Sequence, residues 1–288
     1  YDKGHYEEQE VVVGEGEFAL PGTLTLPQGD GPYPVAILVQ GSGPHDRDSS
    51  IGGAKIFKDL AAGLAEQGIA TLRYEKVTKE HTFKVAATPK FTIGNESVDD
   101  VFRAVKLLKG NRKIDASRIY VAGHSQGGYV VPKIFAQDAD SSIAGAILLS
   151  APSDQLMNVI VEQQQVALER LEQLGAPEET LTAQKQAMAL YGNVAKMLSD
   201  PAYSADNLPA SFPFQPAYWW FEQRDYVPAT AAVKQTKPML ILQGENDWQV
   251  SMKQYEGWRE ALKDRTNVEY RSYPKVNHLL TEYDGLSV

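Results

Sequence analysis

Short, uninterrupted apolar runs recur along this chain, and each has the length of one β-strand. The runs cover residues 35–39, 69–72, 144–149 and 238–242. Such runs are typical of parallel strands that helices cover on both faces. Two earlier segments, residues 11–13 and 23–26, indicate an antiparallel pair instead.

Amphipathic segments separate these strands. One predicted helix ends at Gly68, and a second follows from apolar residues that recur at helical spacing from Val98 to Leu108. We expect Asn95 or Ser97 to be the N-cap of the second helix. The alternation predicts an α/β fold with a mostly parallel central sheet and right-handed crossovers.

From Asp154 to Lys237 the strand pattern disappears and long amphipathic patterns replace it. We expect a helical cap at residues 154–228, inserted into a core formed by residues 1–153 and 229–288. The later part of this insertion is rich in aromatic residues and proline, and its aromatic side chains either form the cap core or face the substrate. We expect at least one of three to line the pocket mouth: Trp219, Trp220 and Phe221.

Composition narrows the possible functions. The 288 residues carry a net charge of −9 and no basic run, which argues against nucleic acid because its binding depends on Lys and Arg contacts to phosphate. The chain has no cysteine, and its five histidines form no HExxH motif, so we expect no metal. It has neither a P-loop nor GxGxxG, so we expect no cofactor. No apolar stretch is long enough to span a membrane.

The sequence GHSQG at residues 123–127 follows a strand-like run and precedes a helix-like one. This is the pattern of a nucleophile elbow, in which a sharp turn leaves no room for side chains beside the serine. We predict that Ser125 is the nucleophile; a glycine-rich turn with an idle serine is the alternative. Pro132 lies inside the helix expected after the elbow and should kink that helix or shift its register. We expect His124, whose side chain should point away from Ser125, to be structural.

An acid and a histidine follow Ser125 in the order of a Ser-Asp-His triad. Asp247 comes after the apolar run at 238–242, and His278 comes after another strand-like run. In such a triad His278 takes the proton from Ser125, while Asp247 fixes the imidazole tautomer. Glu245 is the competing acid, but it fits a solvated turn position better, and we prefer Asp247.

Two backbone N–H groups should form an oxyanion hole. We assign them to Gln126 and to Ser42, which lies in the glycine-containing loop after the strand at 35–39; the alternative is a tight loop without function. The charged residues 45–48 either order this loop, with Arg47 or Arg73 as donor, or form a solvated loop. Further candidate substrate contacts are Gln40, Tyr129 and Trp248, of which the last two also fit a packing role.

Five segments together resemble the α/β-hydrolase superfamily: GSGPHDRD at 41–48, LRYEK at 72–76, GHSQGG at 123–128, LQGENDWQV at 242–250 and VNHLL at 276–280. They are similar, more narrowly, to bacterial secreted or envelope carboxylesterases and serine-aminopeptidase-like hydrolases. The resemblance implies an α/β-hydrolase fold and a secreted or envelope location; a cytoplasmic location stays open. The chain departs from the pattern in having Gln40 where many relatives have histidine, and in stopping at Val288, which suggests truncation or an unusual C-terminus.

The leading hypothesis is a carboxylic-ester hydrolase that works through an acyl-enzyme. An aromatic lid offers apolar area to an acyl group but limits its size, so we expect short to medium acyl esters of small alcohols. A serine aminopeptidase, or another hydrolase of amides or thioesters, would use the same triad and stays an alternative. A non-catalytic binding module is a more distant one, because it would normally lose a triad member.

Overall fold

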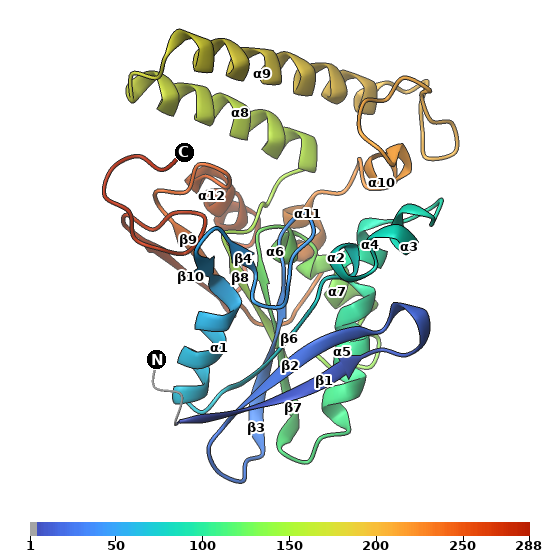
Figure 1. Ribbon diagram of the computed structural model, residues 1–288, viewed down its shortest axis with the longest axis vertical. Helices are drawn as coiled ribbons and strands as arrows, with labels where there is room; N and C mark the ends of the chain where they lie inside the picture. Colours follow the sequence, from blue (N-terminus) through green and yellow to red (C-terminus); the bar gives the residue numbers. More distant parts are fainter. Residues whose placement is uncertain (1–4) are drawn as a thin grey trace.

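The computed structural model describes residues 5–288 and is built around one eight-stranded sheet (Figure 1). In spatial order the strands are β1 (Tyr6–Val13), β2 (Leu20–Pro27), β6 (Ala70–Tyr74), β3 (Tyr33–Val39), β7 (Ile114–His124), β8 (Gly145–Leu149), β9 (Met239–Gly244) and β10 (Val268–Tyr273). β1 pairs antiparallel with β2, and β2 with β6, while all later neighbours are parallel. The predicted antiparallel pair and parallel core are both confirmed.

Helices cover both faces of the sheet, which explains the uninterrupted apolar runs. In β3, Val35 and Ile37 belong to the main core with helices α5 (Asp99–Lys109), α7 (Val131–Gln137) and α12 (Met252–Ala261). The alternate residues of the same strand, Ala36 and Leu38, pack on the other face against helix α1 (Ile56–Glu66). Because neighbouring side chains of a strand point to opposite faces, a strand buried on both faces must be apolar throughout.

Two local predictions about helices have different outcomes. The expected interruption at Pro132 is confirmed, because helix α6 (Gln126–Tyr129) stops before α7 and Pro132 lies in the first turn of α7, where a missing N–H is tolerated. The N-cap predicted for α5 is wrong. Thr92 caps a separate short helix, α4 (Ile93–Ser97), in which Asn95 completes a capping box, and α5 starts after it without a side-chain cap.

Helices and loops occupy the chain between β8 and β9, and we keep the name helical cap for residues 154–228. The helices of this part of the chain are α8 (Leu156–Gln173), α9 (Glu178–Ser199), α10 (Ala217–Glu222) and α11 (Pro228–Val233). α8 and α9 form a hairpin above one end of the sheet (Figure 1). Gly175, with φ 67°, lies in the turn between them. α11 starts at the end of the helical cap and packs against α7 and α12 of the core.

The remaining short elements surround the same end of the sheet. They are β4 (Ser50–Ile51), β5 (Ala54–Lys55), α2 (Val77–Glu80), α3 (Thr82–Ala86) and a 3-10 turn at Gly16–Phe18. None of the helices in residues 5–288 combines the length and the apolar character that crossing a membrane requires.

Candidate active site

Ser125 lies on the sharp turn between β7 and α6. Its backbone has φ 55° and ψ −117°, a strained combination for a residue with a side chain. A Cβ atom at Gly123 would lie 2.2 Å from the carbonyl oxygen of Gly127, and one at Gly127 would lie 2.2 Å from that of Val39. Both flanking glycines are therefore required by space, as the GHSQG sequence predicts.

Asp247 and His278 are in direct contact at the same end of the sheet. The distance from His278 Nδ1 to Asp247 Oδ2 is 2.7 Å, and their side chains are 8% and 0% exposed. The other carboxylate oxygen accepts the N–H groups of Gln249 and Val250, both at 2.9 Å, which fixes its orientation. A carboxylate on Nδ1 holds the proton there and leaves Nε2 free to accept one. Glu245, by contrast, is exposed and accepts a hydrogen bond from the Ser272 hydroxyl.

His124 supports the loop that carries His278. Its Nε2 atom lies 2.8 Å from the backbone oxygen of His278, and the two imidazole rings are 4.8 Å apart. Burial, reinforced by the nearby His278, lowers the pKa of His124 to about 3. His124 is therefore neutral and donates a hydrogen bond to the His278 carbonyl oxygen. This contact is the form that the expected structural role of His124 takes.

The loop Gly41–Gly43 passes beside Ser125, and a Cβ atom at Gly41 would lie 3.3 Å from that of Ser125. Side chains bind all three carbonyl oxygens of this loop. Lys76 Nζ donates to Gly41 and Gly43 at 2.8 and 2.9 Å, and His45 Nε2 lies 2.8 Å from the oxygen of Ser42. The loop that carries the predicted oxyanion donor Ser42 is thus held from several directions.

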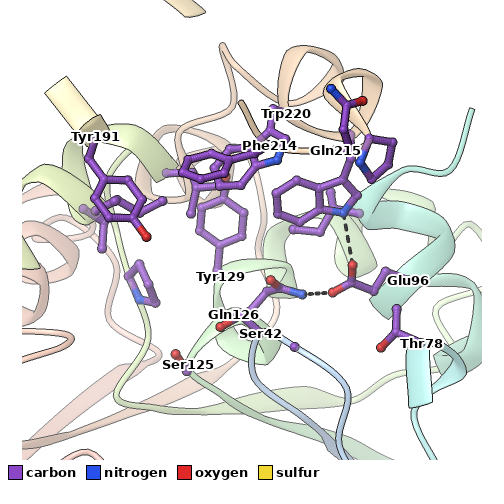
Figure 2. Close-up of a pocket in the computed structure, with 18 of the residues that line it drawn as sticks. Ser42, Thr78, Glu96, Ser125, Gln126, Tyr129, Tyr191, Phe214, Gln215 and Trp220 are labelled. Atoms are coloured by element: carbon purple, nitrogen blue, oxygen red, sulfur yellow. Dashed lines mark hydrogen bonds between the residues drawn. The ribbon is translucent and has the colours of Figure 1, made fainter. Parts of the chain in front are cut away.

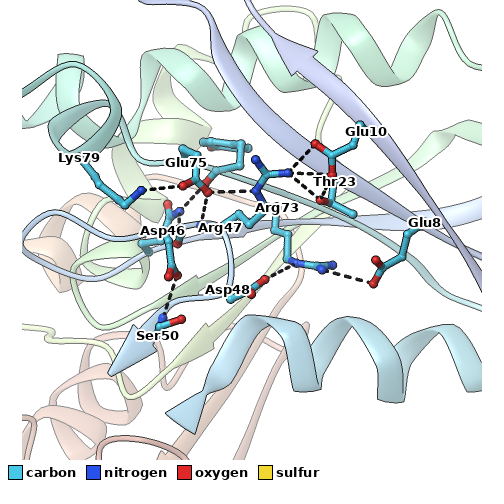
Figure 3. A network of polar contacts seen from close by, with 12 residues as sticks. Glu8, Glu10, Thr23, Asp46, Arg47, Asp48, Ser50, Arg73, Glu75 and Lys79 are labelled. Carbon is cyan, nitrogen blue, oxygen red and sulfur yellow. Dashed lines mark hydrogen bonds and ion pairs between the residues drawn. The ribbon is translucent and has the colours of Figure 1, made fainter. Parts of the chain in front are cut away.

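The charged segment after this loop is held by ion pairs and is not a solvated loop (Figure 3). Arg47 lies 2.8 Å from Glu10 on β1 and 3.0 Å from Glu75. Arg73 on β6 lies 3.0 Å from Asp48. These pairs tie Arg47 and Asp48 to the antiparallel edge of the sheet, with Arg47 and Arg73 as the donors that the sequence predicts.

A cavity of about 670 Å³ lies between the elbow and the helical cap (Figure 2). Ser125, Ser42, Gln126 and Tyr129 are among its lining residues on the core side, and the Tyr129 hydroxyl bonds Gln223 at 3.0 Å. Its walls are mainly apolar. The aromatic residues that the helical cap contributes are Tyr191, Phe214, Trp219 and Trp220. The predicted nucleophile, both predicted oxyanion donors and two of the three predicted aromatic residues therefore border one cavity.

Three candidate substrate contacts lie away from this cavity, which corrects the expectation for them. Phe221 is 3% exposed and packs on Phe212 with ring centroids 5.3 Å apart; successive residues turn by about 100° around a helix, so Phe221 faces away from Trp219. Gln40 is buried, and its side chain donates to the backbone oxygen of Tyr74 at 2.6 Å. Trp248 is half-buried in the turn after β9 and does not line the cavity.

Sequence reasoning missed two residues of this site, Lys76 and Glu96. Lys76 lies 2.8 Å from Glu96 Oε2, and Glu96 borders the cavity. Glu96 also accepts the indole N–H of Trp219 at 3.1 Å and the side-chain amide of Gln126. A lysine two residues after a buried strand, in the LRYEK sequence, is the signal that could have drawn attention to the pair.

No group of three or more His, Cys, Asp or Glu residues that could hold a metal ion occurs within residues 5–288.

Comparison with known proteins places this geometry in context. A family model described as serine aminopeptidase, S33, matches residues 52–284. Esterase EstD from Thermotoga maritima is 35% identical over 287 residues, which cover 99% of this chain; the chain spans 63% of the length of that relative.

Solved structures share the fold at low sequence identity. Acylaminoacyl peptidase from Pyrococcus horikoshii has a TM-score of 0.61 at 15% identity, over 96% of this chain and 38% of that one. Est1E from Butyrivibrio proteoclasticus has a TM-score of 0.59 at 19% identity, over 95% and 91% of the two chains. Together with the family match, these likenesses confirm the predicted α/β-hydrolase fold.

Proposed function

The chain belongs to the family described as serine aminopeptidase, S33, and we propose that it hydrolyses carboxylic esters through an acyl-enzyme formed on Ser125. The observation that carries the proposal is the buried Asp247–His278 pair, 2.7 Å apart, in a fold whose elbow serine borders an apolar cavity. The 35% identical relative is named an esterase, which supports an ester substrate.

The proposed reaction has two steps, formation of the acyl-enzyme and its hydrolysis. Ser125 Oγ attacks the ester carbonyl carbon while His278 Nε2 takes the hydroxyl proton, and the N–H groups of Ser42 and Gln126 stabilise the oxyanion. Collapse of this intermediate expels the alcohol, which takes the proton from His278. Water then attacks the acyl-enzyme, again losing a proton to His278. The acid leaves as this proton returns to Ser125, while Asp247 holds the imidazole throughout.

The cavity favours short to medium acyl esters of small alcohols. Its apolar walls reward each buried methylene group by about 0.8 kcal/mol, and the helical cap above the elbow restricts the entry of larger substrates. Trp219 and Trp220 of the helical cap lie where they would contact that chain. In this proposal the helical cap sets selectivity and the core carries the chemistry.

An aminopeptidase would need an acceptor for the substrate ammonium group, and one observation argues against it. Glu96 is the only acidic residue among the described residues that line the cavity. Its oxygens are already engaged by Lys76, Gln126 and Trp219, and Lys76 compensates its charge. A free α-ammonium group would therefore find no unpaired carboxylate, whereas a neutral ester needs none.

The similarity of the GSGPHDRD and GHSQGG segments to secreted and envelope hydrolases also leads us to propose export from the cytoplasm. Fractionation of the native host, with detection of this chain in periplasm, medium and cytosol, tests the location; recovery in the cytosol alone would contradict it.

The test of function is a panel of p-nitrophenyl esters from acetate to laurate, run beside aminoacyl p-nitroanilides. We expect kcat/KM to be highest for short or medium acyl chains and at background for the anilides. Ser125→Ala should abolish ester turnover with an unchanged circular dichroism spectrum, because the change removes the nucleophile but little packing. Faster turnover of the anilides, or of long-chain emulsified lipid, would contradict the proposal.

A further inference from the structure

Lys76 is buried to an unusual degree for a lysine, with 3% of its side chain exposed. Its ammonium group has three acceptors: the carbonyl oxygens of Gly41 and Gly43, at 2.8 and 2.9 Å, and Glu96 Oε2, at 2.8 Å. An ammonium group has three N–H donors, so all of them are used. Burial lowers the pKa of Lys76, and the charge of Glu96 opposes that change.

Holding the Gly41 carbonyl group determines where the Ser42 N–H points. The Gly41–Ser42 peptide bond is trans, and in a trans peptide the N–H is directed opposite to the preceding carbonyl group. With the Gly41 oxygen bound to Lys76, the Ser42 N–H must point away from Lys76. Gly43, with φ 86°, gives this loop the freedom to adopt other conformations. The hydrogen bonds from Lys76 exclude conformations in which the Ser42 N–H points elsewhere.

Glu96 connects Lys76 to the other side of the cavity. Its side chain is 9% exposed and bonds Gln126, the residue that supplies the second proposed oxyanion donor, as well as Trp219 of the helical cap (Figure 2). One buried carboxylate thus touches Lys76, the elbow and the helical cap. An ion pair with only a packing role would not need to contact the Gly41–Gly43 loop, the elbow and the helical cap together.

We infer that Lys76 and Glu96 are positioning residues of the oxyanion hole: Lys76 orients the Gly41–Gly43 loop so that the Ser42 N–H faces the reacting carbonyl, and Glu96 holds Lys76 and the elbow residue Gln126 in register. The kinetic consequence rests on the proposed ester hydrolysis. The predicted effect on the conformation of the Gly41–Gly43 loop does not rest on that activity.

The test compares Lys76→Met, the double variant Lys76→Met/Glu96→Met and the control Lys84→Met. Lys84 is exposed and bonds one backbone oxygen, that of Glu17, outside the cavity. The double variant matters because removing one partner of a buried ion pair strongly destabilises a protein, whereas replacing both by apolar residues of similar size is often tolerated. The readouts are kcat and KM for p-nitrophenyl butyrate, and amide hydrogen exchange of a peptide that covers residues 41–45.

We expect both Lys76 variants to lower kcat by about 10- to 100-fold with KM changed by less than about twofold, since the oxyanion hole acts on charge that develops in the transition state. Exchange at residues 41–45 should become faster in both. Lys84→Met should match the wild type in both readouts.

A wild-type kcat in either folded Lys76 variant would overturn the inference. So would a kcat loss in Lys76→Met that the double variant restores, because it would come from the unpaired Glu96 alone. If Lys76→Met does not fold, the double variant decides. If the wild-type protein hydrolyses no ester, the proposed function fails. The exchange readout then still decides: faster exchange confined to residues 41–45 supports the positioning role, and unchanged exchange overturns it.

Discussion

The buried imidazole of His124 makes the stability of this protein depend on pH. Burial and the neighbouring His278 lower the pKa of His124 to about 3, against an ordinary value of about 6.5 that applies when the chain is unfolded. Above pH 6.5 the group is neutral in both states and contributes no pH dependence. As the pH falls below 6.5, the unfolded chain binds a proton that the native protein does not, so the free energy of unfolding decreases.

The size of this effect follows from the displacement of the pKa. Each pH unit between the two values removes about 1.36 kcal/mol, so the loss from pH 7.5 to pH 5 is about 2 kcal/mol. The effect levels off only near pH 3, where the native imidazole itself takes up a proton. A change of this size is a large fraction of the stability of an ordinary domain.

The variant that isolates this contribution is His124→Gln, because glutamine can still donate to the His278 carbonyl but does not titrate. Urea unfolding of both proteins at pH 7.5 and pH 5 gives four free energies. We expect the wild type to lose about 2 kcal/mol more than the variant between the two pH values. Equal losses in the two proteins would refute the reasoning, since they would mean that His124 takes up a proton in the native state as readily as in the unfolded chain.

Five other substitutions test the site and the fold. Asp247→Asn should lower kcat by up to about 10⁴ in ester assays because it disturbs the imidazole tautomer, while Glu245→Gln, at an exposed position, should change kcat less than about twofold; the reverse order would mean that the wrong acid was chosen. Gly123→Ala should abolish fluorophosphonate labelling or prevent folding, because its Cβ atom would lie 2.2 Å from a backbone oxygen, and a labelled, folded variant would argue against the elbow. Trp220→Ala should change the acyl-chain preference measured with the ester panel. Phe221→Ala should instead lower the free energy of unfolding by about 3 to 5 kcal/mol, as expected for a buried aromatic side chain, and so lower the melting temperature. The opposite pattern would contradict the assignment of Trp220 to the cavity wall.

Much of the fold was predictable because the strands are buried on both faces. A strand such as β3 has no polar face to accommodate, so its apolar run is visible in the sequence alone. The order of Ser125, Asp247 and His278 was equally visible, since each follows a strand end and the carboxyl ends of parallel strands meet at one edge.

Other features depend on contacts between distant segments and leave no local pattern. Lys76 follows β6 and Glu96 lies on α4, so only the folded chain brings the two charges together, and the sequence around Glu96 gives no sign of the pairing. The difference between Trp220 and Phe221 depends on which side of α10 faces the cavity and which packs inside the helical cap, and hydrophobicity does not encode this because both side chains are aromatic. The N-cap of α5 was misplaced because Asn95 serves the short helix before it.

The central claim is that Ser125 is an activated nucleophile, and labelling with a fluorophosphonate tests it most directly. Intact mass and peptide mapping of the treated protein should show one adduct, on Ser125, that is absent from Ser125→Ala and strongly slowed in His278→Ala. A folded protein that forms no adduct, or forms it on another residue, would contradict the account.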